Sequence, residues 1–114
     1  MLPKVNRLTK KKDFDAVFKT GQGVKAGFLI AKAIKNTLPA NRFGFVVSKK
    51  VSAKAVVRNK IKRQLRSAVE QAIKSSVARG AHFDVVIIAL PTAATKEFQE
   101  IKTAVASLLK KISP

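Results

Sequence analysis

The sequence lacks cysteine, tryptophan and tyrosine altogether, and it holds a single histidine in 114 residues. Without cysteine the chain can build neither a disulfide framework nor a thiolate metal site, and it has no thiol nucleophile. The lone His82 stands directly before an apolar segment, with no second histidine to share a metal ion, so we expect it at the edge of a strand. We therefore predict that the protein itself carries no catalytic site and no metal site.

Long apolar runs are also missing. No segment reaches the length needed to cross a membrane, and the basic residues at the start are not followed by the apolar stretch and cleavage site of a secretory signal. We therefore expect a cytoplasmic protein without a membrane partner. Hydrophobic residues nevertheless make up 46% of the chain, which excludes a disordered tail. No repeat or linker interrupts it, which predicts one domain over residues 1–114.

Acidic residues are scarce: six stand against 24 lysines and arginines, which gives a net charge of +18. None lies between Ala16 and Val69, and one stretch of that region is dense in cations: Lys49, Lys50, Lys54, Arg58, Lys60, Lys62, Arg63 and Arg66. A solvated helix face is the ordinary explanation of such a run, but like charges without interleaved acids repel one another. The pattern therefore predicts a polyanionic partner. Nucleic acid fits better than a membrane surface, because the cations do not lie on one long free amphipathic helix.

The spacing of apolar residues predicts helices and strands in alternation. A short helix capped by Thr9 should end at Gly21 and carry Phe14, Val17 and Phe18 on one face. Strands are expected at residues 28–34, 43–48 and 83–90, with a loop of hairpin length at residues 36–41. The last strand is apolar enough to be covered on both faces.

The longest helix is expected at residues 54–77, ending at Arg79-Gly80. Its buried stripe should consist of Val57, Ile61, Leu65, Ala68, Ala72 and Ile73. Arg58, Lys62 and Arg66 line up on another face, with Asn59 and Arg63 beside them. A last helix over residues 96–111, capped by Thr95, should bury Phe98, Ile101, Val105, Leu108 and Ile112. The order predicts a small α+β sandwich with helices packed on a sheet.

Two patterns allow more than one interpretation. Phe14 and Phe18 lie one helical turn apart in a lysine-rich setting, so they either pack in the core or wall a groove in which unpaired bases stack. Their spacing does not decide between these roles. Asp13 and Asp15 do not face each other on a helix, and we interpret them as charges that favour its N-terminus rather than as an acid–base pair.

One segment resembles the signature of a known family. It reads Ala-Val-Val-Arg-Asn-Lys-Ile-Lys-Arg-Gln-Leu-Arg over residues 55–66, and Phe-Gly-Phe-Val-Val-Ser-Lys-Lys-Val precedes it over residues 43–51. Arg7-Leu8, Asp13-Phe14, Val17-Phe18 and Gly21 fit the same pattern near the start, as do an apolar strand and a helix at the end. Over essentially the whole chain, these motifs resemble the protein component of bacterial ribonuclease P.

The resemblance implies an α-β-β-β-α-β-α sandwich with a left-handed crossover, similar to a domain of a ribosomal protein and of an elongation factor. Such proteins join one large catalytic RNA, without an obligatory protein partner, and together they remove the 5′ leader of precursor tRNA. The RNA subunit performs the hydrolysis and holds most of the magnesium. Carried over by position, the residues that would contact the catalytic RNA are Arg58, Asn59, Lys60, Lys62, Arg63 and Arg66. Phe14, Phe18 and Phe28 would line the leader cleft, with Lys49 and Lys50 at its rim.

Other functions remain compatible with charge and composition alone. A structural RNA-binding protein, such as a ribosomal protein, would have the same balance of residues, and only the signature segment separates it from a ribonuclease P subunit. A free-standing nuclease is disfavoured because no carboxylate or histidine cluster is present. Binding to double-helical DNA is disfavoured because no helix-turn-helix partner accompanies the basic helix.

Overall fold

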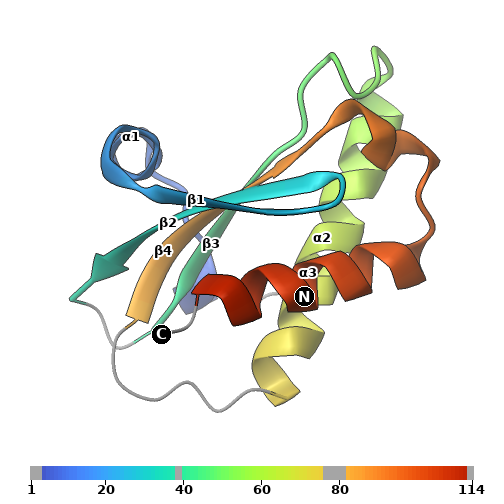
Figure 1. The fold of residues 1–114 in the computed structure, drawn as a ribbon. Coiled ribbons are helices and arrows are strands. Elements are labelled where there is room, and N and C mark those ends of the chain that lie inside the picture. Colours follow the sequence, from blue (N-terminus) through green and yellow to red (C-terminus); the bar gives the residue numbers. More distant parts are fainter. Residues whose placement is uncertain (1–3, 38–39, 76–81, 113–114) are drawn as a thin grey trace.

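A computed structural model describes residues 4–37, 40–75 and 82–112. The chain begins with a short 3₁₀ turn at Lys4–Asn6, followed by α1 (Lys11–Thr20), β1 (Gln22–Ala26), β2 (Leu29–Asn36) and β3 (Arg42–Val46). It continues with α2 (Ala55–Ser75), β4 (His82–Ala89), a 3₁₀ turn at Pro91–Thr95 and α3 (Phe98–Ile112). The predicted α+β class and element order are confirmed (Figure 1).

The four strands form one sheet in the order β1-β2-β4-β3. β1 and β2 form an antiparallel hairpin around Gly27, whose φ of 58° is one that glycine adopts without strain. β4 pairs antiparallel with β2 and parallel with β3. The loop after Asn36 therefore has the length of a hairpin but joins two strands that are not partners. α2 forms the crossover between β3 and β4, and the left hand of that crossover stays a prediction from the resemblance.

Helices lie on both faces of the sheet (Figure 1). α2 and α3 cover one face, where the buried cluster includes Leu65, Ile87 and Ile101. α1 packs on the opposite face, where Val17 is buried with Leu8 and Val86 and further apolar residues lie against them. β4 alternates between the two clusters, which confirms that this strand is covered on both faces.

The apolar stripe of α2 is confirmed, and it fixes which side of this helix is left for a partner. Ile61, Leu65, Ala68 and Val69 are buried, while Val57, Ala72 and Ile73 pack against the same cluster from its margin. The predicted end of the helix at residues 79–80 lies outside the described residues. In α3 the predicted residues Ile101, Val105 and Leu108 are buried, and Phe98 and Ile112 pack beside them.

Both predicted helix caps are wrong. α1 begins after Lys10, which makes no side-chain capping hydrogen bond, so Thr9 lies one residue too early. Thr95 belongs to the 3₁₀ turn, where its hydroxyl donates to the carbonyl oxygen of Thr92. The residue directly before α3 is instead Glu97, whose carbonyl accepts from Ile101 N and whose own N–H donates to the Glu100 carboxylate at 3.4 Å.

Candidate nucleic-acid interface

The basic residues of α2 form one surface because the apolar stripe occupies the other side of the helix. Asn59, Lys60, Arg63 and Arg66 are exposed, and Lys62 is half-buried. At helical spacing these side chains cover adjacent parts of the surface over about two turns. The predicted residues therefore lie together, with the exception of Arg58. We call this group of five residues the α2 basic surface.

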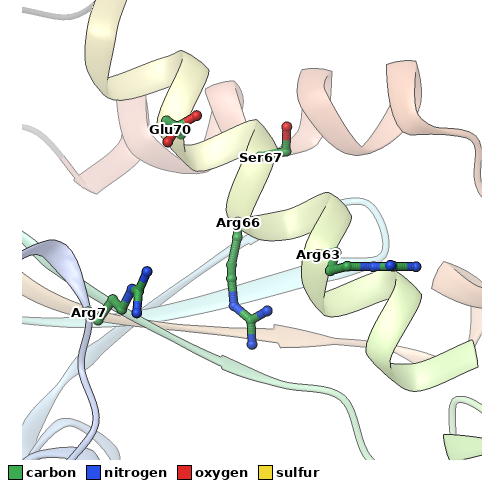
Figure 2. Close-up of a pocket in the computed structure, with 5 residues that line it drawn as sticks. All are labelled: Arg7, Arg63, Arg66, Ser67 and Glu70. Carbon is green, nitrogen blue, oxygen red and sulfur yellow. The ribbon is translucent and has the colours of Figure 1, made fainter. Parts of the chain in front are cut away.

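A hollow of about 550 Å³ lies beside this surface and brings in a residue that the sequence did not identify. Its lining consists of Arg63, Arg66, Ser67 and Glu70 from α2 and Arg7 from the segment before α1 (Figure 2). Arg7 is held there because its backbone forms a parallel bridge to Phe43. Leu8 N also donates to the Phe43 carbonyl at 2.9 Å, which lays the N-terminal segment along β3. Arg7 thus lines the same hollow as Arg63 and Arg66 of α2, although it comes from a distant part of the chain.

Arg58 is oriented differently from the other cations of α2. Its Nη1 donates to the carbonyl oxygens of Ser52 at 2.9 Å and Ala53 at 3.0 Å, in the turn that precedes the helix. The same turn carries Lys49 and Lys50, which are both exposed. Arg58 therefore holds the backbone of this turn as well as adding to the positive charge, a role that its place in the signature does not indicate.

The two phenylalanines of α1 differ in exposure, which resolves part of the ambiguity left by their spacing. Phe14 is half-buried and lies so close to Gly44 of β3 that any side chain at position 44 would overlap its ring. Phe18, one turn later, is 39% exposed. Its carbonyl oxygen accepts a long hydrogen bond of 3.5 Å from Nζ of Lys32 on β2. Phe14 therefore attaches α1 to the sheet, while the ring of Phe18 is accessible to a partner.

The structure does not bring Phe28 together with Phe14 and Phe18. Phe28 lies at the turn between β1 and β2, is 9% exposed and belongs to the cluster beneath α2 and α3. Nζ of Lys96 lies 5.6 Å from the centre of its ring, a cation–π geometry on that side of the molecule. Of the three aromatic residues that the resemblance assigns to a leader cleft, Phe14 and Phe18 lie together on α1, and Phe28 lies on the other side of the sheet.

A charged cluster lies beneath the N-terminal end of α1. Asp84 of β4 is 5% exposed, the only charged side chain among the buried residues of the described chain. Burial alone would raise the pKa of Asp84, but hydrogen bonds from Arg42 and Asn36, together with the charge of Arg42, outweigh it and hold this pKa below its ordinary value. The hydrogen bond to Asp84 in turn raises the pKa of Arg42. Both groups are therefore ionised at neutral pH.

No group of three histidine, cysteine or carboxylate side chains in the described ranges is placed to hold a metal ion. His82 begins β4 and pairs with Asn36 of β2, as expected for a residue at the end of a strand. No helix in this part of the chain is long and apolar enough to cross a membrane. The exposed cations of α2 suit the binding of a polyanion.

Comparisons with known proteins agree with this picture. The family model described as ribonuclease P matches residues 2–113. The ribonuclease P protein component of Clostridium botulinum strain 657 is 36% identical over 95% of both chains. That of Caldanaerobacter subterraneus is 35% identical over 97% of this chain and 92% of its own. The RNase P protein structure from Staphylococcus aureus matches with a TM-score of 0.81 and 30% identity over 95% of both chains. That from Thermotoga maritima has a TM-score of 0.81 and 29% identity over 95% of this chain and 98% of its own. The chain therefore belongs to the ribonuclease P protein family.

Proposed function

We infer that this chain is the protein subunit of ribonuclease P and acts in removing the 5′ leader of precursor tRNA. The observation that carries this conclusion is the family match over residues 2–113, which spans the whole fold rather than the basic segment alone. The signature over residues 55–66 lies on α2, with its cations separated from the core. The protein is a component of a ribonucleoprotein endonuclease, in which an RNA subunit carries out the hydrolysis.

The catalytic RNA is the proposed partner of the α2 basic surface and Arg7. Arginine forks and lysine ammonium groups bind phosphate oxygens, and each neutralised phosphate releases counterions, which favours assembly. The amide of Asn59 adds a group that can hydrogen-bond a base edge or a 2′-hydroxyl. The shared hollow of Arg7 and Arg66 supports this assignment, because a phosphate group there could be reached from two different segments of the chain.

The leader of precursor tRNA is the proposed partner of the exposed side of α1. The accessible ring of Phe18 can stack on an unpaired base, which contributes about 1–3 kcal/mol per base in such complexes. Lys49 and Lys50 supply charge for the leader backbone from the turn that Arg58 holds. Phe14 packs against Gly44 of β3 and so holds α1 on the sheet. We propose no leader contact for Phe28, which packs toward α3.

Magnesium is proposed to be held mainly by the RNA subunit. The protein's described carboxylates do not form a site that would fit the ion, and its buried Asp84 is already bonded to Arg42 and Asn36. The contribution of the protein is therefore to bind, to position the leader and to reduce repulsion between two polyanions, which should lower the magnesium concentration that cleavage requires. A cytoplasmic location, where tRNA precursors are processed in bacteria, belongs to the same proposal.

The experiment that tests this function measures precursor-tRNA cleavage at low magnesium with bacterial ribonuclease P RNA alone, protein alone, and both together. We expect cleavage only in the mixture, at the mature 5′ end. Cleavage by the protein alone would point to a free-standing nuclease. Binding of RNA without any stimulation of cleavage would contradict the proposal and favour a structural RNA-binding protein.

A further inference from the structure

A network of charged and amide groups joins four elements at one end of the sheet. Asp84 on β4 lies opposite Arg42 in the parallel β3–β4 register. Arg42 donates from Nε to Oδ1 at 2.8 Å and from Nη2 to Oδ2 at 2.7 Å. Asn36 on β2 donates to the same Oδ1 at 2.8 Å. The two parallel bonds fix the plane of the guanidinium group, as in other bidentate arginine–carboxylate pairs.

The fixed guanidinium group extends this network to α1. Its remaining terminal nitrogen, Nη1, lies 3.4 Å from Oδ2 of Asp13. The Asp13 and Arg42 side chains are each only 21% exposed, so this ion pair is partly shielded from water and salt. Asp15, two residues later, is exposed. The first turn of α1 is therefore tied to the sheet through one of its two aspartates.

A second contact between α1 and β3 lies beside the first. Gly44 follows Arg42 by two residues on β3, so both positions lie on the same face of the strand. On that face Arg42 meets Asp13 and Gly44 meets the ring of Phe14. Two consecutive residues of α1 are thus attached to two same-face positions of one strand. One turn further along the rigid helix, Phe18 is exposed.

We propose that Asp13 and Arg42 are positioning residues for leader binding. They determine where the first turn of α1 lies on the sheet, and thereby where the ring of Phe18 stands to receive a base. The inference rests on the proposed function, because it presumes that Phe18 contacts the leader. Neither Asp13 nor Arg42 needs to touch the RNA, since both act through the placement of the helix.

The test compares Asp13→Asn with Asp15→Asn, which remove the same charge from the same helix. Each variant is assembled with ribonuclease P RNA, and affinity is measured for precursor tRNA and for mature tRNA. We expect Asp13→Asn to lower the ratio of the two affinities by up to about fivefold, the range of a partly exposed ion pair, and Asp15→Asn to leave it unchanged. Equal effects of the two variants would overturn the inference, since charge alone would then explain them.

A double-mutant cycle with Phe18→Ala separates positioning from simple stabilisation. If Asp13 acts through Phe18, the variant that combines Asp13→Asn with Phe18→Ala should lose no more leader-dependent affinity than Phe18→Ala alone. Additive losses would contradict the inference and leave the leader contact intact. If Phe18→Ala itself leaves the ratio unchanged, the leader assignment fails as well, and the two failures are therefore distinguishable. Arg42→Lys, which keeps the charge but cannot bond both carboxylates, should behave as Asp13→Asn does.

Discussion

Arg58 and Arg63 carry the same charge on the same helix, but their surroundings give them different roles. Arg63 is exposed beside the hollow that Arg7 and Arg66 also line. Arg58 bonds the backbone of the turn at Ser52 and Ala53. The resemblance implied that both contact RNA, and a match by position does not show which way a long side chain turns. Single residues must therefore be tested for geometry as well as charge.

Replacing Arg58 by Lys should loosen this turn, because both hydrogen bonds come from Nη1 at the tip of the arginine and the shorter lysine side chain does not bring its ammonium group to the same point. We expect faster amide hydrogen exchange at residues 49–54 in the free protein, by roughly fivefold for ~1 kcal/mol of lost bonding. Arg63→Lys keeps its charge at an exposed site and serves as the control, with exchange at residues 49–54 unchanged. Indistinguishable exchange in the two variants would mean that Arg58 contributes charge only.

Asp84 gives the stability of the fold a defined dependence on pH. Its folded-state pKa is lowered, so its stabilising contribution is fully present above the unfolded-state pKa of about 3.9 and is lost as pH falls through the lower folded-state value. Asp84→Asn should cost about 2 kcal/mol at neutral pH, since it removes the charge from the hydrogen bonds that Arg42 donates. Urea unfolding at several pH values checks this. The stabilities of variant and parent should converge in acid, and a constant difference would exclude the ion pair as its source.

Helices and strands that have a strong apolar pattern of their own were predicted from the sequence. Features that depend on contacts with neighbouring segments were not. The apolar stripe of α2 and the apolar run of β4 can each be recognised within one continuous stretch of sequence. β1 was missed by apolar spacing, although the resemblance implied three strands before the long helix. It is an edge strand in which only Val24 and Ala26 pack inward, so its composition gives little signal. The caps failed because Lys10 and Glu97, rather than the nearby threonines, occupy the helix starts.

The α2 basic surface should act as a unit in assembly with the catalytic RNA. Replacing Arg63 and Arg66 together by Ala removes two proposed phosphate contacts, so we expect weaker assembly and a slope of log K against log salt that is shallower by about 1.5–2. Filter binding at several salt concentrations measures the slope. Lys102→Ala with Lys110→Ala on α3 removes the same charge as a control, and an equal change of slope there would argue against a specific surface on α2.

The whole molecule carries its charge of +18 on a fold of modest size, with a radius of gyration of 13.1 Å. Total charge and class of partner could be predicted by counting residues. The placement of Arg7 beside α2, and the pairing of Arg42 with both Asp13 and Asp84, could not, because each depends on segments that only the folded chain brings together. The sequence thus indicated what the molecule binds better than which residues are placed to bind it.

Multivalent anions should stabilise the free protein, because the repulsion among its cations is relieved when an anion binds the folded form. We expect sulfate to raise the melting temperature and to increase the helical circular dichroism if part of the free chain is unfolded. Sodium chloride at matched ionic strength separates binding from general screening. If sulfate changes neither the melting curve nor the spectrum, the free protein is fully folded without a bound anion, despite the repulsion among its cations.

The position of β4 between β2 and β3 has a consequence for how the chain folds during its synthesis. β2 and β3 both hydrogen-bond to β4, yet they leave the ribosome well before it does. Until β4 arrives, both strands have an unpaired edge and α2 lacks much of the surface on which it packs. Native contacts between distant segments then form late and together, which makes folding slow relative to a helical bundle. A nascent chain that stalls before residue 82 therefore presents open strand edges beside a strongly basic segment, a combination prone to capture by RNA or by other chains.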